Sequence, residues 1–167
     1  MSGKVLVVMG SDSDWSKMEA AVLTLKSFGV EVDVHVASAH RTPERAVALS
    51  CGARENGFSV IIAAAGVAAH LAGVLASKTT LPVIGVPLSG GALNGLDALY
   101  STVQMPPGIP VATVAIDGAR NAALLAIQIM AVADETLAEK LAAEKAAMYD
   151  QVRERSDKVR ALAGLEV

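Results

Sequence analysis

The chain has 167 residues, a formal net charge of -3 and a composition that is 53% hydrophobic but only 3% aromatic. Its length fits one domain with a substantial apolar core. Its acidic balance and scattered aromatic residues argue against a nucleic-acid binder, because such proteins neutralise phosphates with a basic surface and stack bases on rings. A single cysteine cannot form a disulfide framework, and no leader pattern precedes the first apolar run, so we expect a cytoplasmic protein.

Charge is spread unevenly along the chain. Residues 134–160 carry thirteen charged side chains, whereas the 78 residues from 56 to 133 carry only four. A lone subunit would solvate the middle section poorly, so we expect other copies of the chain to cover part of it. Residues 57–76 lack charge and are long enough to suggest a membrane span. Small residues and a histidine interrupt this stretch, so we expect a strand, a turn and a helix there, and no membrane association.

Short apolar runs alternate with segments of helical spacing along most of the chain. The predicted strands cover residues 5–9, 31–36, 59–64, 82–86 and 111–115. The predicted helices cover residues 14–28, 45–56, 68–77, 94–103, with Asn94 as N-cap, 119–133 and a highly charged 134–161. Five strand–helix units in series predict an α/β fold with a parallel sheet covered on both faces.

The chain contains no internal repeat, low-complexity tract or linker, so residues 1–167 are expected to form one domain. Its α/β core would cover residues 1–133, and the helix over residues 134–161 would pack on a neighbouring subunit. With five strands the common doubly wound order is 2-1-3-4-5. In that order a crevice opens beyond the carboxyl ends of the first and third strands, so the loops after the first three strands should build the site.

The loop after the first strand is Gly-Ser-Asp-Ser-Asp-Trp at residues 10–15. The hydroxyls of Ser11 and Ser13, with the amides that open the next helix, suit a phosphate or a ribose. The alternative is that Ser11 to Asp14 only cap the helix. The loop lacks the Walker A lysine and the spacing of a dinucleotide fingerprint, so ATP and NAD are poor candidates.

The loop after the second strand, residues 38–45, places a histidine beside an arginine. His40 can carry a proton near neutral pH, and Arg41 can hold a phosphate or carboxylate with two hydrogen bonds. Thr42 is predicted to cap the next helix and Pro43 to open it, which would fix the direction of both side chains. The alternative is a surface histidine with an incidental arginine.

The loop after the third strand, residues 63–70, has almost no large side chains. A ligand could lie directly against such a backbone, although a tight connection would need small residues too. His70 falls in an apolar helical segment, where histidine more often packs than binds. His35 lies within a predicted strand and receives no role.

Several other site classes are not supported by the sequence. Three separated histidines and one cysteine have no metal-ligand spacing, and no G-x-S-x-G elbow of a serine hydrolase is present. Cobalamin binding on this fold would need a histidine in the loop after the first strand, which has none.

Five motifs together resemble the class I PurE family, the N5-carboxyaminoimidazole ribonucleotide mutases of bacterial purine synthesis. They are GSDSDW at 10–15, SAHRTPER at 38–45, AAHL at 68–71, PVIGVP at 82–87 and LNGLDALYSTVQMPPGIPVATVAI at 93–116. The resemblance implies a flavodoxin-like three-layer subunit in a homo-octamer that acts without metal or organic cofactor. The implied substrate is an aminoimidazole ribonucleotide with a carbamate on its exocyclic nitrogen, and the carboxylate moves to ring carbon 4.

The resemblance also implies roles for individual residues. His40 would be the general acid and base. The ribose phosphate would be held by Ser11, Ser13, Asp14 and Arg41. The walls around the heterocycle are assigned to Ser38, Ala39, Ala65, Gly66 and Ala69, with His70 lining the same pocket from the next helix.

The third loop departs from the pattern that is usual in the family. Ala64 and Val67 stand where glycines are usual, Ala72 replaces a proline and Val74 replaces a methionine. Val67 disfavours a positive φ. Two alternatives to the mutase are a class II relative that carboxylates the unsubstituted ribonucleotide with free CO2, and a non-catalytic nucleotide- or flavin-binding module.

Overall fold

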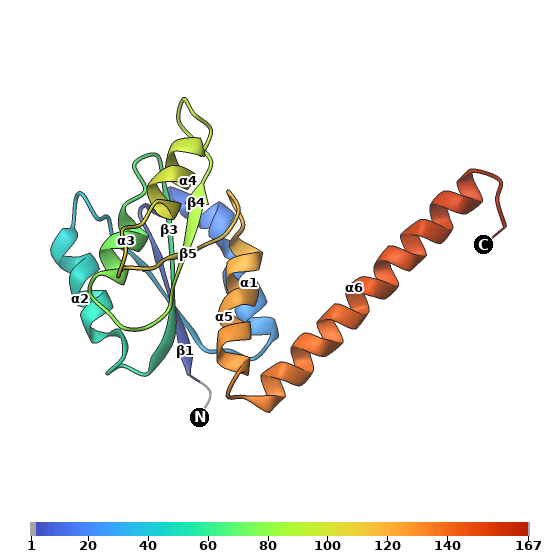
Figure 1. Ribbon diagram of the computed structural model, residues 1–167, viewed down its shortest axis with the longest axis horizontal. Helices are drawn as coiled ribbons and strands as arrows, with labels where there is room; N and C mark the ends of the chain where they lie inside the picture. Colours follow the sequence, from blue (N-terminus) through green and yellow to red (C-terminus); the bar gives the residue numbers. More distant parts are fainter. Residues whose placement is uncertain (1–2, 167) are drawn as a thin grey trace.

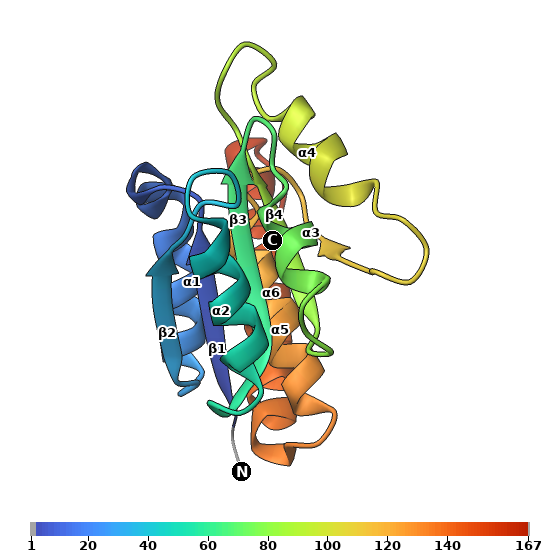
Figure 2. The same ribbon diagram turned by 90° about the vertical axis from the view of Figure 1, so that its left-hand side faces the viewer.

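A computed structural model describes residues 3–166 of the chain, so residues 1, 2 and 167 of the expected 1–167 domain lie outside the described residues. The elements in chain order are β1 (Lys4–Met9), the short 3-10 helix η1 (Asp12–Asp14), α1 (Trp15–Ser27), β2 (Val32–Val36), α2 (Pro43–Ala53), β3 (Phe58–Gly66), α3 (Leu71–Ala76), β4 (Val83–Leu88), α4 (Leu96–Val103), β5 (Ala112–Thr113), α5 (Ala119–Ala131) and α6 (Glu135–Leu162). The strands form one five-stranded parallel sheet in the order β2-β1-β3-β4-β5, which confirms the predicted topology (Figures 1 and 2).

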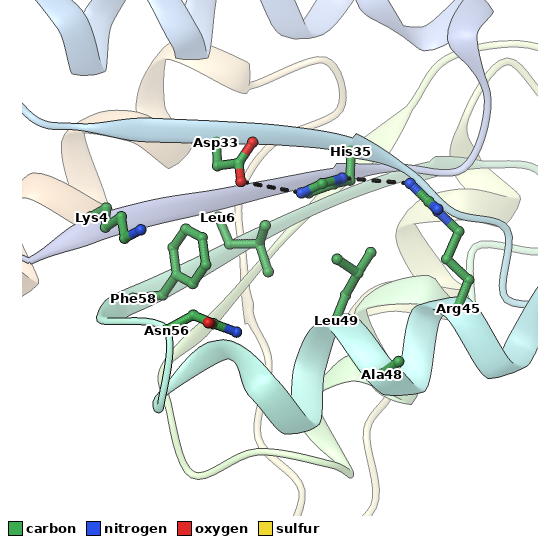
Figure 3. Close-up of a pocket in the computed structure, with 9 residues that line it drawn as sticks. All are labelled: Lys4, Leu6, Asp33, His35, Arg45, Ala48, Leu49, Asn56 and Phe58. Atoms are coloured by element: carbon green, nitrogen blue, oxygen red, sulfur yellow. Dashed lines mark hydrogen bonds and ion pairs between the residues drawn. The ribbon is translucent and has the colours of Figure 1, made fainter.

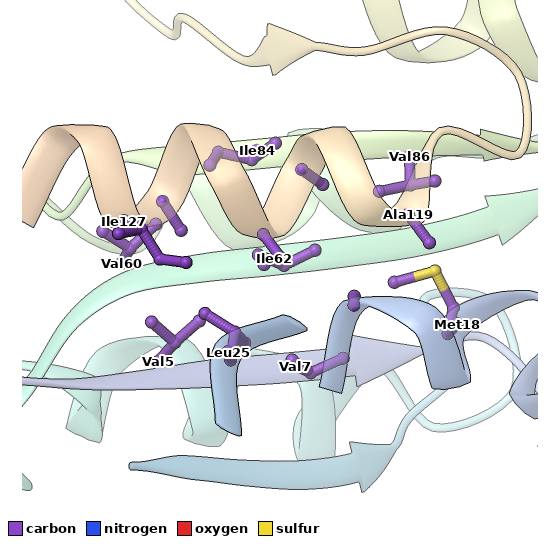
Figure 4. Packing of buried hydrophobic residues seen from close by; sticks show 14 of the residues in the cluster. Val5, Val7, Met18, Leu25, Val60, Ile62, Ile84, Val86, Ala119 and Ile127 are labelled. Carbon is purple, nitrogen blue, oxygen red and sulfur yellow. The ribbon is translucent and has the colours of Figure 1, made fainter. Parts of the chain in front are cut away.

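The sheet is the middle of three layers, with α1 and α5 on one face and α2, α3 and α4 on the other (Figure 1). Along β1, Val5 and Val7 pack toward α1 and α5, whereas Leu6 and Val8 pack toward α2 and α3. Figure 4 shows the first of these two clusters. Burial on both faces explains why the central strands are continuous apolar runs instead of alternating ones.

Some element boundaries differ from the sequence prediction. β3 continues to Gly66, and α3 begins only at Leu71, three residues later than expected. The predicted N-cap Asn94 is wrong, because Asn94 lies in the left-handed region at φ 48 and Gly95 occupies the N-cap position. β5 shrinks to two residues, Ala112 and Thr113, because only that stretch pairs with β4.

The first turns of α6 pack on the body of the same chain, and the remainder projects away from it (Figure 1). Leu137 is buried, the Lys140 ammonium donates to the Phe28 carbonyl at 2.7 Å, and Arg120 pairs with Glu144. Beyond these contacts the helix exposes several apolar side chains to solvent. They are Met148, Tyr149, Val152, Val159 and Leu162. Within residues 3–166, no helix combines the length and apolar character needed to cross a bilayer.

Candidate functional site

The loops after β1, β2 and β3 meet around one cavity of about 300 Å³, at the edge of the sheet where the doubly wound topology predicts a site. The residues that line this cavity are Gly10, Ser11, Ser38, Ala39, His40, Arg41, Ala65, Gly66, Ala68, His70 and Leu71. The fold therefore brings most of the residues proposed from the sequence into one small space. Ser13, Asp14 and Ala69 are not among the lining residues.

Two histidines face each other in the cavity. The His40 Nε2 atom lies 3.2 Å from the His70 Nδ1 atom, and the rings meet edge to face with centroids 5.4 Å apart. His70 is exposed and precedes α3 at its N-cap position, so its interpretation as a packing histidine within a helix is wrong. A hydrogen bond between two imidazole nitrogens needs one donor and one acceptor, so His70 constrains which nitrogen of His40 carries a proton.

The serine-aspartate loop, residues 10–15, is stabilised by hydrogen bonds between its own side chains and its own backbone. The Asp14 carboxylate accepts the Ser11 N–H at 3.0 Å, and the Ser11 hydroxyl oxygen accepts the Ser13 N–H at 3.4 Å, which forms a capping box. Burial raises the pKa of Asp14, although the Ser11 N–H bond and the nearby Lys17 act in the opposite direction. Capping and site formation are therefore compatible, because Asp14 shapes the loop whose Ser11 lines the cavity.

The His40–Arg41 loop is closed by hydrogen bonds between Ser38 and Thr42. The Thr42 hydroxyl oxygen accepts the Ser38 N–H at 2.9 Å, and the Ser38 hydroxyl oxygen accepts the Arg41 N–H at 3.2 Å. Thr42 occupies the predicted N-cap position of α2, but its side chain does not cap the helix amides. The Arg41 guanidinium reaches the Gly10 carbonyl at 3.4 Å and so joins the first two loops.

The third loop supplies a wall of small residues. Ala65 and Gly66 line the cavity as expected, whereas Ala69 is buried and the neighbouring Ala68 and Leu71 take its place. The sequence pattern could not predict that Ala68 and Leu71 line the cavity in place of Ala69. Which of these residues lines it depends on the direction in which each side chain leaves the turn.

A second polar cluster, formed by Lys17, Ser89 and Asp117, joins the segments that follow β1, β4 and β5. The Lys17 ammonium donates to the Ser89 hydroxyl oxygen at 2.7 Å and to the Ser89 carbonyl, and it lies 3.5 Å from the Asp117 carboxylate. Asp117 in turn accepts the Ser89 N–H at 2.8 Å. Burial opposes ionisation, but the hydrogen bonds from Ser89 and the charge of Lys17 hold the pKa of Asp117 below its usual value. Sequence reasoning missed this cluster because its members are far apart in the chain.

No three histidine, cysteine, aspartate or glutamate side chains gather as a metal-ligand group within residues 3–166. The fold and the cavity define a class: a doubly wound α/β protein with a small-molecule site at the switch point of its parallel sheet. A family model described as AIR carboxylase matches residues 4–151. The chain belongs to this family, the PurE or AIR carboxylase family.

Relatives from distant organisms support this assignment. An N5-carboxyaminoimidazole ribonucleotide mutase of Pyrococcus abyssi is 58% identical over 138 residues, which cover 83% of this chain and 79% of the relative. The mutase of Escherichia coli is 51% identical over 156 residues, which cover 92% of each chain. The crystal structure of Treponema denticola PurE matches with a TM-score of 0.83 and 29% identity, covering 93% of this chain and 98% of that chain.

Proposed function

We propose that the protein is an isomerase of purine (IMP) biosynthesis. It converts N5-carboxyaminoimidazole ribonucleotide into 4-carboxy-5-aminoimidazole ribonucleotide by moving the carboxylate from the exocyclic nitrogen to ring carbon 4. The placement of His40 in the cavity, 3.2 Å from His70 and beside Arg41 and Ser11, carries the proposal. The mutases of Pyrococcus abyssi and Escherichia coli, at 58% and 51% identity, support it.

The reaction needs one proton to be given and one to be taken back. Protonation of the exocyclic nitrogen breaks its bond to the carboxylate carbon and releases CO2. Ring carbon 4 then attacks the retained CO2, a new carbon–carbon bond forms, and that ring carbon loses its proton. A single imidazole can donate in the first step and accept in the second, so we assign both transfers to His40. The small cavity would keep the CO2 near the ring.

The remaining site residues are proposed to bind the substrate. Ser11 and Arg41 would hold the ribose phosphate, with Ser13 and Asp14 acting from the same loop. The heterocycle would lie against small or polar wall residues and the second histidine. These are Ser38, Ala39, Ala65, Gly66, Ala69 and His70, of which Ala69 would act from beneath the cavity wall.

We also propose that the protein is a cytoplasmic homo-octamer that uses no metal or organic cofactor. The charge-poor middle section leaves an apolar face on α4 and the loop before it, formed by Leu93, Leu96, Tyr100 and Val103. Subunit contacts would cover this face, and the projecting part of α6 would pack on a neighbour.

Turnover by the purified protein tests the proposal. Wild type should interconvert the two carboxylated ribonucleotides without ATP, biotin or added metal, and His40→Asn should lower kcat by about 10³-fold, as expected for loss of a general acid and base. The variant should keep the wild-type circular dichroism spectrum and native mass, which separates lost chemistry from lost folding. A wild-type protein that does not interconvert the two compounds contradicts the proposal.

The AIR carboxylase description of the matching family model favours one second candidate. In that reaction the unsubstituted aminoimidazole ribonucleotide would react with free CO2. A competition assay that offers the carbamate and the unsubstituted ribonucleotide with bicarbonate decides between the two. Preferential use of the carbamate supports the mutase.

A further inference from the structure

A second cavity of about 440 Å³ adjoins the one that holds His40. Its lining residues are Gly10, Ser11, Asp12, Val36, Ala37, Ser38, Arg41, Thr42 and Arg45. Four residues, Gly10, Ser11, Ser38 and Arg41, line both cavities, so the two are lobes of one depression. The histidine lobe holds the two imidazoles, and the arginine lobe adds a second guanidinium, that of Arg45.

The Arg45 side chain is held by the edge strand β2. Its Nε atom donates to the Val36 carbonyl at 3.0 Å, and its Nη2 atom lies 3.5 Å from the Nδ1 atom of His35. The other ring nitrogen of His35 lies 3.2 Å from the Asp33 carboxylate. Figure 3 shows this series of side-chain contacts from Asp33 through His35 to Arg45. These contacts limit the directions available to the guanidinium and hold Arg45 at the boundary between the arginine lobe and a neighbouring cavity that Asp33 and His35 also line.

The charge of Arg45 is not neutralised by an ion pair. Among residues 3–166 the ion pairs involve other cations, and no carboxylate pairs with Arg45. One carboxylate, that of Asp12, also lines the arginine lobe, where it accepts the Ser11 hydroxyl at 3.1 Å. Arg41, Arg45 and Asp12 are the charged residues that line the lobe, which gives it a net formal charge of +1.

We propose that Arg45 is a second phosphate-binding residue, with the substrate's phosphate in the arginine lobe between Arg41 and Arg45. The heterocycle then occupies the histidine lobe beside His40. This inference rests on the proposed function, because it takes an aminoimidazole ribonucleotide as the ligand. The division into lobes matches such a ligand, which has a flat ring at one end and a dianion at the other. Guanidinium groups suit phosphate oxygens because they donate two parallel hydrogen bonds.

Binding of ribose 5-phosphate tests Arg45 without turnover. In titration calorimetry, Arg45→Met should weaken this binding about tenfold, as expected for loss of a charge-assisted hydrogen bond. Arg45→Lys keeps the charge but not the paired donors, so it should weaken binding about threefold. The matched control is Arg54→Met, which removes an arginine from just beyond the same helix. Arg54 donates to the Thr80 hydroxyl oxygen at 3.0 Å and lines a different cavity, so this variant should bind like wild type.

Turnover supplies a second readout. Arg45→Met should raise KM for the carboxylated ribonucleotide about tenfold and leave kcat within about twofold of wild type, because phosphate binding is remote from the reacting atoms. With the dephosphorylated nucleoside, wild type and Arg45→Met should have equal kcat/KM. Equal binding of ribose 5-phosphate by Arg45→Met and Arg54→Met overturns the inference. A wild type without interconversion contradicts the proposed function instead, and the ribose 5-phosphate titration still tests Arg45.

Discussion

Val67 has a backbone conformation that is unfavourable for a β-branched residue. Its φ is 56, in the left-handed region, where a β-branched residue is strained. The residue is 55% exposed, so packing offsets little of this strain. The turn imposes the conformation, because β3 ends at Gly66, the Ala69 N–H donates to the Val67 carbonyl at 3.0 Å, and Ala69 is buried. A residue that disfavours positive φ therefore occupies a position that requires it.

Val67→Gly should stabilise the protein. The left-handed region costs an L-residue about 1–2 kcal/mol, and glycine loses about 0.5–1 kcal/mol more chain entropy on folding. The net gain therefore lies between about 0 and 1.5 kcal/mol, and a gain of about 1 kcal/mol would raise Tm by about 3 °C in calorimetry. Val67→Ala keeps a Cβ atom and should gain less. A Tm of Val67→Gly below that of wild type contradicts this account.

The sequence places the site residues on the correct loops but does not show how they meet. His40 and Arg41 were predictable as a pair because they directly follow a strand at the switch edge of the sheet. The contact between His40 and His70 was not predictable, since it depends on α3 beginning at Leu71 and leaving His70 outside the helix. That Ala68 and not Ala69 lines the cavity was unpredictable for the same reason. The conformation of the turn decides which of two neighbouring side chains faces the cavity.

At the scale of elements, the strand order was predictable and the short elements were not. Continuous apolar runs such as β1 and β4 mark strands buried on both faces, and five strands with intervening helices leave few parallel topologies. The short apolar run at residues 111–115 predicts the whole of it as a strand, but only Ala112 and Thr113 pair with β4. Hydrogen bonding to a neighbouring strand, which no local pattern encodes, sets the length of such an edge element.

Three elements at the carboxyl edge of the sheet are tied together by the Lys17, Ser89 and Asp117 cluster. α1 contributes the ammonium, the segment after β4 contributes the serine, and the segment before α5 contributes the carboxylate. The segment after β4 also approaches the third loop, since a Cβ atom on Gly91 would lie 3.6 Å from Val67. The cluster thus holds Ser89, two residues before the glycine that neighbours Val67 of the third loop.

Asp117→Asn should destabilise the fold at neutral pH and hardly at all in acid. Because the folded-state pKa of Asp117 is lowered, its ionised form stabilises the fold above the ordinary value of 3.8, and this contribution is lost as pH falls through the folded-state pKa. Allowing for solvent screening of this partly exposed group, we expect a loss of about 1 kcal/mol in the free energy of unfolding at pH 7. Asparagine tolerates the φ of 56 at this position, so backbone strain does not enter.

Urea unfolding followed from pH 7 to pH 3 measures the effect. The difference between wild type and Asp117→Asn should shrink below about pH 4, as the wild-type carboxylate takes up a proton. Glu19→Gln, which removes an exposed carboxylate from α1, is the control and should change stability little at either pH. A difference between wild type and Asp117→Asn that is independent of pH would show that the charge of Asp117 does not stabilise the cluster.

At the scale of the whole molecule, residues 3–166 include two surfaces on which several large apolar side chains are exposed together. One is the α4 face, where Leu96, Tyr100 and Val103 are 44%, 56% and 45% exposed. The other is the projecting part of α6, where Val152 and Val159 are both 64% exposed. A helix that projects from its own domain with an apolar stripe gains little stability alone, because tertiary packing stabilises most protein helices. The α4 face lies in the charge-poor section, and α6 is the helix predicted to pack on a neighbouring subunit. The sequence therefore predicts contacts between copies at both surfaces.

Light scattering on the intact protein tests whether copies cover these surfaces. Wild type should have a native mass of eight times 17.1 kDa. The double variant Val152→Glu and Val159→Glu should lower that mass, because it places two carboxylates on the apolar stripe of α6, where burial against a neighbour would desolvate them. The control is Gln151→Glu with Ser156→Glu, which adds the same two charges at exposed polar positions of the same helix and should keep the wild-type mass. A wild type of monomer mass would contradict the assembly, and equal masses for the two double variants would show that the α6 stripe is not a subunit contact.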